Sequence, residues 1–258
     1  MDARMQTEND HARPAQSLRI ALWQTPHPSP GNAGHALACL DAAAAQAAQH
    51  GAHWLVTPEM LMTGYMIDPA QLAALAQPAD GPWAQAVAAI AQRHRLGIVY
   101  GWPESHPAGA RPYNAAQAIG PDGRRLGVHR KVHLFGAADA ERFSPGEEVG
   151  TPFDWEGWRI GLLICYDVEQ RAAVRALAAQ GARVILVPTA NMLPYDDAPC
   201  LTLPRLAAES RVVIAYANAC GAEGDTRYGG LSRLVAADGR VVAAAGRGEA
   251  LLIGDSPD

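Results

Sequence analysis

The chain has 258 residues, of which 49% are hydrophobic and 18% charged, a composition typical of a folded globular protein. Its net charge of −5 and its lack of a long basic run exclude nucleic acid or an anionic membrane surface as the main partner. No segment approaches the roughly 18 uninterrupted apolar residues of a membrane span, and the polar start lacks the apolar core of a secretory signal. Four cysteines in so long a chain do not suggest a disulfide framework, so we expect a cytoplasmic protein.

Strand and helix patterns alternate through the first half of the chain. Residues 1–16 are polar and are expected to form a flexible tail. A glycine follows each of the two predicted helices and marks its end. The predicted elements are strands at 18–23, 54–56, 97–102, 114–120 and 125–130, and helices at 32–50 and 82–94.

The second half begins with residues 131–150, which show no period and are predicted to form a long functional loop. Beyond it, hairpin patterns mix with helices. The predicted elements are strands at 152–155, 159–164, 184–188, 212–218, 231–236, 241–245 and 250–253, and helices at 168–180 and 201–209. No linker divides residues 17–255. We therefore predict a single domain with a mixed α/β fold, in which helices cover sheets.

Lys131 is the only lysine among the 21 basic residues; the other 20 are arginines. Arginine keeps its proton and has a wide planar head, whereas lysine is a compact ammonium whose pKa can be tuned. A lone lysine therefore suggests a site at which arginine cannot serve. The alternative is an incidental surface residue.

Cys165 lies between an apolar strand and a predicted helix. A nucleophile at such a turn is exposed at the end of a sheet, and backbone N–H groups nearby can bind an oxyanion. The start of the helix is expected to lower the pKa of the thiol. The alternative is a small buried core residue. For the other three cysteines, Cys39, Cys200 and Cys220, a core or incidental residue is the preferred interpretation.

A cysteine nucleophile needs a base, and the nine histidines offer no clear candidate beside an Asp or Asn. His129 and His133 are four residues apart but in an extended segment, so we predict no metal site there. Glu59 follows the strand at 54–56, where burial would raise the pKa of a carboxylate toward that of a working base; the alternative is a solvated loop glutamate. Because Glu59, Lys131 and Cys165 all follow strands, we expect them at one edge of the fold.

Five segments resemble the carbon–nitrogen hydrolases of the nitrilase superfamily, and the likeness extends over about residues 18–253. They are LVTPEMLMTGY (55–65), HRKVHLFG (129–136), ERFSPGEE (141–148), GLLICYDVE (161–169) and VPTANMLPYD (187–196). Within the superfamily the chain is most similar to short-chain aliphatic amidases, the branch of 5-aminopentanamidase and the stereoselective amidases. The resemblance implies a four-layer α-β-β-α sandwich that forms a homodimer or higher homo-oligomer.

The resemblance also implies roles for individual residues. Glu59 would be the general base, Lys131 the cation that stabilises the oxyanion, and Cys165 the nucleophile. Glu141 would orient substrate and lysine, and the backbone N–H of Tyr166 would be the second oxyanion donor. The implied reaction converts a small aliphatic amide, such as an ω-aminoamide, to a carboxylate and ammonia through a cysteine thioester, without a cofactor or a metal ion.

The sequence departs from the family pattern after Glu169, where Gln170-Arg171-Ala172 replaces the usual Phe-Pro-Glu. The candidate substrate-binding residues are Tyr65, Tyr166, Asn191, Met192, Tyr195 and Asp196. Asp196 or Asp197 could hold a substrate ammonium; the alternative is a solvated carboxylate in a turn.

Other functions stay open at this point. A nitrilase or an N-carbamoyl amino acid hydrolase would use the same three residues on a different substrate. A non-catalytic scaffold of the same fold is less compatible with the presence of all three residue types. A histidine-dependent cysteine peptidase would need a histidine beside Cys165 in place of Glu59.

Overall fold

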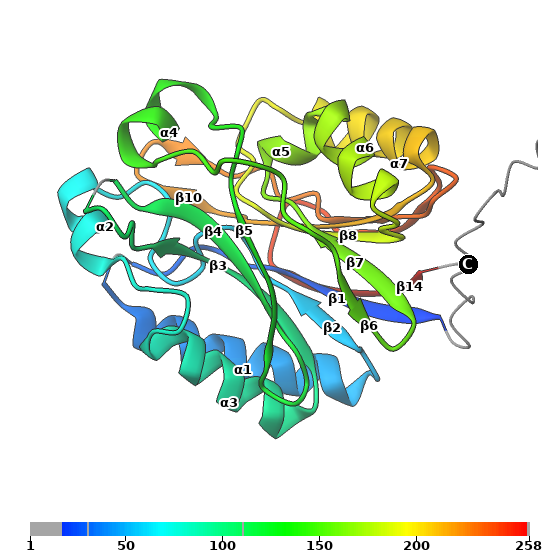
Figure 1. The fold of residues 1–258 in the computed structure, drawn as a ribbon, viewed down its shortest axis with the longest axis horizontal. Helices are drawn as coiled ribbons and strands as arrows, with labels where there is room; N and C mark the ends of the chain where they lie inside the picture. Colours follow the sequence, from blue (N-terminus) through cyan, green and yellow to red (C-terminus); the bar gives the residue numbers. More distant parts are fainter. Residues whose placement is uncertain (1–16, 30, 110, 257–258) are drawn as a thin grey trace, which may run out of the picture.

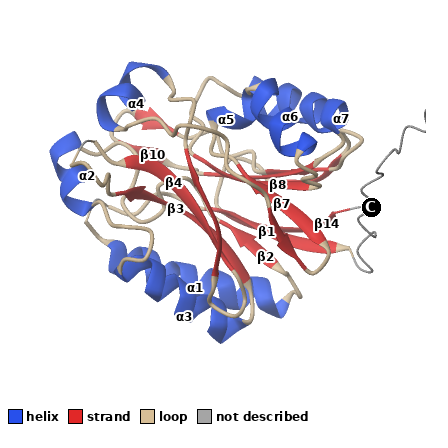
Figure 2. Ribbon diagram, in the orientation of Figure 1, coloured by secondary structure: helices blue, strands red, loops and turns tan. Residues whose placement is uncertain are grey.

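Two six-stranded sheets lie face to face, and helices cover their outer faces (Figures 1 and 2). This arrangement is seen in a computed structural model, which describes residues 17–29, 31–109 and 111–256. The four layers confirm the predicted α/β sandwich and its single domain. The tail predicted at residues 1–16 lies outside the described residues.

The first sheet is built around three parallel strands. Its order is β14 (Ala250–Ser256), β1 (Leu18–Gln24), β2 (Trp54–Val56), β3 (Gly97–Glu104), β4 (Tyr113–Ile119) and β5 (Arg125–Arg130). The strands β1, β2 and β3 run parallel, and the other three are antiparallel to their neighbours. Helices α1 (Ala33–Gln49) and α3 (Pro82–His94) lie in the long crossover connections that parallel strands need.

The second sheet has a matching parallel centre. Its order is β13 (Val241–Ala244), β12 (Arg233–Val235), β9 (Val213–Asn218), β8 (Val184–Thr189), β7 (Trp158–Leu162) and β6 (Phe153–Trp155). The strands β7, β8 and β9 run parallel. Helices α6 (Arg171–Ala179) and α7 (Leu203–Ser210) cover its outer face (Figure 1).

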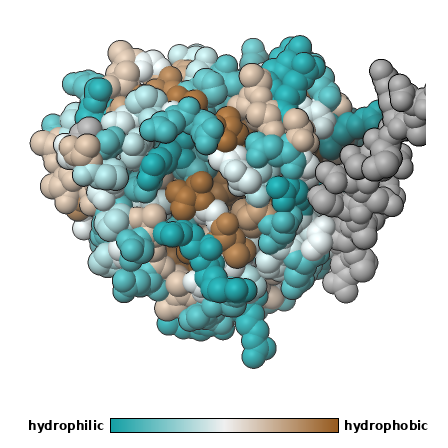
Figure 3. All heavy atoms as spheres, viewed as in Figure 1, coloured by the Kyte–Doolittle hydropathy of each residue, from teal (hydrophilic) through white to brown (hydrophobic). Residues whose placement is uncertain are grey.

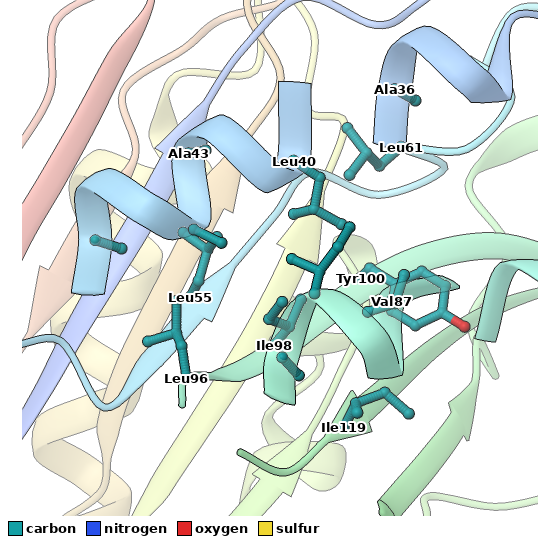
Figure 4. Close-up of a cluster of buried hydrophobic side chains, with 14 of the residues drawn as sticks. Ala36, Leu40, Ala43, Leu55, Leu61, Val87, Leu96, Ile98, Tyr100 and Ile119 are labelled. Atoms are coloured by element: carbon teal, nitrogen blue, oxygen red, sulfur yellow. The ribbon is translucent and has the colours of Figure 1, made fainter. Parts of the chain in front are cut away.

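Three apolar layers hold these elements together, one between the sheets and one under each helical layer. Under α1 the buried side chains recur at helical spacing and are mostly alanines, which let the helix lie close to the sheet. Leu40 packs there beside Leu55, Val87 and Ile98 (Figure 4). Each such leucine or isoleucine contributes about 1.5–3 kcal/mol by burial.

Several elements differ from the predictions. The loop predicted at 131–150 contains a helix, α4 (Gly136–Arg142), and α2 (Pro69–Leu75) was not predicted, although Asp68 caps it and Pro69 begins it. The continuous helix predicted at 168–180 is wrong. It is broken at Gln170, whose backbone is extended, into α5 (Tyr166–Glu169) and α6. Three further short elements complete the structure, namely the π-helix η1 (Ala198–Thr202), β10 (Ala222–Glu223) and β11 (Thr226–Arg227).

On the face drawn in Figure 3, hydrophilic side chains predominate and hydrophobic ones form separate patches. Across the described residues, no helix is long and apolar enough to cross a bilayer.

Candidate active site

The three residues singled out in the sequence all lie beyond strand ends. Glu59 comes three residues after β2, Lys131 directly follows β5, and Cys165 comes three residues after β7. Glu59 and Lys131 therefore belong to the first sheet and Cys165 to the second. The carboxyl ends of the parallel strands in both sheets meet at this edge, as expected for a site in an α/β fold.

Glu59 is fully buried and accepts three hydrogen bonds. Its Oε1 accepts from Lys131 Nζ at 2.9 Å and from Asn114 Nδ2 at 2.6 Å. Its Oε2 accepts from the backbone N–H of Ala190 at 2.9 Å, which connects the two sheets. Burial raises the pKa of Glu59, as predicted, although the neighbouring Lys131 ammonium opposes the shift.

Gly101 on β3 allows the loop that carries Glu59 to lie close to the first sheet. A Cβ atom at Gly101 would lie 2.5 Å from the backbone nitrogen of Met60 and 3.0 Å from Cα of Glu59. Real Cβ atoms essentially never approach so closely, so the position of Glu59 depends on a glycine here.

Lys131 is likewise fully buried. Besides Glu59, its Nζ donates to Oδ2 of Asp139 at 2.8 Å and to the hydroxyl of Tyr65 at 3.4 Å. Burial alone would lower the pKa of Lys131, but the surrounding acidic groups outweigh it and raise the pKa well above its ordinary value. Lys131 therefore remains a cation, and a positive charge in this position can stabilise a developing oxyanion.

The carboxylate that holds Lys131 is Asp139, not the predicted Glu141. Asp139 is buried on α4, and its Oδ1 also accepts from the Tyr65 hydroxyl. Glu141 is exposed, and its carbonyl oxygen accepts from the Arg111 guanidinium. Two residues along an α-helix differ by about 200° in direction, so α4 cannot turn both carboxylates toward the lysine. Because this segment shows no period in the sequence, the pattern offers no way to choose between the two acids.

Cys165 has a strained backbone, with φ +45° and ψ −112°, and its side chain is 9% exposed. A non-glycine residue in such a conformation costs about 1–3 kcal/mol and is held by its surroundings. Here the Cys165 N–H donates to the carbonyl of Pro188 at 3.0 Å, and the Cys165 carbonyl accepts from Val168 N–H at 3.0 Å.

The prediction that a helix start lowers the thiol pKa is wrong. Burial raises the pKa of Cys165, the charge of Glu59 adds to the rise, and Lys131 offsets only part of it. The helix α5 is a single turn of four residues and contributes little dipole. The thiol is therefore neutral at rest and needs a base to remove its proton.

Cys165 opens into a pocket that contains most of the predicted substrate-binding residues. The pocket is lined by Tyr65, Phe135, Cys165, Tyr166, Glu169, Ala190, Asn191, Met192 and Tyr195. The sequence analysis missed Phe135, Glu169 and Ala190. Phe135 contacts the rings of Tyr166 and Tyr195 edge-on, each at 5.2 Å between centroids. The backbone N–H of Tyr166 makes no hydrogen bond to another described residue and is free to bind a ligand.

Asp196 does not line this pocket. Its carboxylate forms an ion pair with Arg247 at 2.5 Å on the protein surface. The prediction that Asp196 binds substrate is therefore not supported by its position, because the residue already has a cationic partner far along the sequence.

Asp167 connects the Lys131 segment to the Cys165 turn. It is buried and accepts from the backbone N–H groups of Val132 at 3.2 Å and His133 at 2.8 Å. Its two oxygens also lie 2.8 Å from His129 Nε2 and His133 Nδ1. Burial favours a raised pKa, but His129 and the N–H donors outweigh it and lower the pKa of Asp167. The two histidines thus share a carboxylate.

Comparison with known proteins agrees with this geometry. The profile of the carbon–nitrogen hydrolase family matches residues 19–257. A Pseudomonas protegens protein named "Hydrolase in pqqF 5'region" is 45% identical over 239 residues, which cover 93% of this chain and 82% of that protein. An (R)-stereoselective amidase of Pseudomonas sp. is 36% identical over 196 residues, covering 76% of this chain and 69% of the amidase.

Solved structures show the same fold. A mutant of the amidase from Nesterenkonia sp. AN1 has a TM-score of 0.87 and 33% identity, covering 95% of this chain and 93% of that one. In that structure the acetamide moiety of fluoroacetamide is covalently attached to the active-site cysteine.

Proposed function

We propose that this chain, which belongs to the carbon–nitrogen hydrolase family and is an amidase, hydrolyses small aliphatic amides through a thioester on Cys165. An ω-aminoamide is the substrate that the sequence suggests. The observation that carries the proposal is the buried pair of Glu59 and Lys131, 2.9 Å apart, beside the pocket that Cys165 lines.

In the first step, Sγ of Cys165 attacks the amide carbon while Glu59 accepts the thiol proton. Burial raises the pKa of Cys165, so the thiol keeps its proton until a base removes it, and burial also raises the pKa of Glu59, which makes this carboxylate a stronger base than an ordinary glutamate. As the S–C bond forms, the carbonyl electrons move to oxygen. The Lys131 ammonium and the Tyr166 N–H stabilise this oxyanion.

The intermediate then collapses. Glu59 gives its proton to the amide nitrogen, the C–N bond breaks, ammonia leaves and an acyl thioester remains. A water molecule next attacks the thioester while Glu59 accepts one of its protons. The second collapse releases the carboxylic acid and returns the proton to Cys165. Glu59 thus alternates between base and acid, for which a raised pKa is suited.

Ammonia release from a panel of short amides, a nitrile and an N-carbamoyl amino acid tests the proposal. We expect turnover of the amides and accumulation of an acyl adduct on Cys165, detected as a mass increase after rapid quenching. Cys165→Ala should abolish turnover while the protein remains folded. Full turnover by that variant would exclude the cysteine mechanism. Turnover of the nitrile or the carbamoyl compound alone would reassign the substrate class within the family.

We also propose that the chain forms a homo-oligomer through the surface near the pocket. Tyr195 of the pocket lining is 47% exposed, Leu193 beside Met192 is 40% exposed, and Leu201 on the following η1 is 64% exposed, which is high for large apolar side chains. Sedimentation equilibrium tests this expectation; a monomer at micromolar concentration would contradict it.

A further inference from the structure

Glu169 is the acidic side chain of the pocket lining, and its negative charge is not neutralised by another described residue. It is the last residue of α5 and lines the same pocket as Cys165, one helical turn further along the chain. Its carboxylate is half-buried, yet it makes no hydrogen bond or ion pair to any described side chain. By contrast, two or more hydrogen bonds reach each of the other buried carboxylates of the site, those of Glu59, Asp139 and Asp167.

The charge balance of the site is negative. The pocket lining includes Glu169 and no described lysine, arginine or histidine. The adjoining cluster holds one cation, Lys131, between the carboxylates of Glu59 and Asp139. Even with Glu59 protonated, the cluster is neutral and Glu169 leaves a net negative charge.

Burial of an unpaired carboxylate is unfavourable, and it raises the pKa of Glu169, with Lys131 offsetting only part of the effect. A cationic group that enters the pocket would restore the lost solvation by a charged hydrogen bond. A ligand carboxylate in the same place would be repelled by the negative charge of Glu169, because the site is partly desolvated. The pocket therefore favours cationic ligands over anionic ones.

We propose that Glu169 is the specificity-determining residue of this amidase and binds the ammonium group of a substrate whose amide carbon lies at Cys165. This inference rests on the proposed amidase function. A chain of a few carbon atoms can join the two groups, because Glu169 lies one helical turn beyond the nucleophile. The role predicted for Asp196 is thus reassigned to a residue inside the pocket, whereas Asp196 is paired with Arg247.

Three amides of similar length and different charge test the assignment: 5-aminopentanamide (cationic), pentanamide (neutral) and 4-carbamoylbutanoate (anionic). We expect the wild-type kcat/KM to fall in that order. In Glu169→Gln, the ratio of kcat/KM for the cationic amide to that for the neutral amide should fall about 10- to 100-fold, the effect of losing one charged hydrogen bond. Glu169→Asp, which keeps the charge, should retain more of this ratio than Glu169→Gln.

Glu148→Gln is the matched control, because Glu148 is exposed and does not line the pocket. It removes the same charge and should leave the ratio unchanged. Thermal unfolding midpoints verify that each variant is folded. A folded Glu169→Gln enzyme with the wild-type ratio would overturn the assignment, as would wild-type hydrolysis of pentanamide without preference for the cationic amide. Failure of all three amides to release ammonia would instead refute the proposed function.

Discussion

Nζ of Lys131 lies 2.9 Å from Oε1 of Glu59, and neither side chain is exposed. The two residues are 72 positions apart in the chain and follow different strands of one sheet. Each compensates the charge of the other where both side chains are buried. Because the same ammonium also contacts Asp139, the pair belongs to a buried cluster with more acid than base. Stability and catalysis therefore depend on the same contacts.

Lys131→Met should cost both activity and stability. The substitution leaves the carboxylates of Glu59 and Asp139 buried without their cation, which we expect to lower the free energy of unfolding by about 3–5 kcal/mol. Loss of one oxyanion donor should lower kcat by about 10²–10³-fold. Urea unfolding and steady-state ammonia release measure the two effects.

The double variant Glu59→Gln with Lys131→Met distinguishes the two contributions. With the base also neutral, we expect the protein to regain part of the lost stability but no activity. If the stability loss of the double variant equals the sum of the losses of the two single variants, Glu59 and Lys131 are not directly coupled.

Asp139→Asn and Glu141→Gln should differ sharply, although the residues are two positions apart. Asp139 holds Lys131 by a charged hydrogen bond, so its neutralisation should lower kcat about 10- to 100-fold, equivalent to about 1.5–3 kcal/mol. The Glu141 side chain is exposed, and its variant should stay within about twofold of wild type. Equal losses in both variants would contradict the arrangement of α4.

The pH dependence of kcat/KM should show an acidic limb governed by Glu59. Its raised pKa means that the carboxylate is protonated, and unable to act as a base, at a higher pH than an ordinary glutamate with pKa about 4.3. Activity should therefore fall as the pH drops through that raised value. Lys131 has a raised pKa too, so it should lose its proton only above about pH 10.4 and produce no alkaline limb below that.

Asn114→Ala tests this assignment, because Asn114 donates to Glu59 and lowers its pKa. Removing the donor should move the acidic limb to higher pH. An acidic limb that stays at the same pH in this variant would mean that a group other than Glu59 produces it.

Gly101→Ala should displace the loop that carries Glu59. The added methyl group would overlap the backbone of Met60, so we expect a loss of about 1–3 kcal/mol in stability and a larger fall in kcat than in KM. Gly34→Ala is the matched control: a methyl group added there, in α1, would meet no atom within 4 Å, and alanine favours the helix by about 0.5–1 kcal/mol. Equal destabilisation by both substitutions would contradict this interpretation.

Most strands and helices could be read from local patterns. The strands at 54–56 and 125–130 and the helix at 82–94 have the predicted bounds, because apolar periodicity and flanking glycines act over a few residues. The same local signals singled out Glu59, Lys131 and Cys165: a carboxylate and a thiol directly beyond buried strands, and one lysine among arginines. Residue type and position in the chain were enough for these.

Contacts between segments that are distant in the sequence could be identified only in the folded structure. Which acid meets Lys131 depends on the direction in which α4 turns, and whether Asp196 is available depends on Arg247, 51 residues away. The pKa of Cys165 rises because packing of two sheets removes water, an effect that no neighbouring residue in the sequence announces. Periodicity indicates which side of an element is buried, but not which residues lie against it. The partners of Asp139 and the lack of a partner for Glu169 could therefore be identified only in the folded structure.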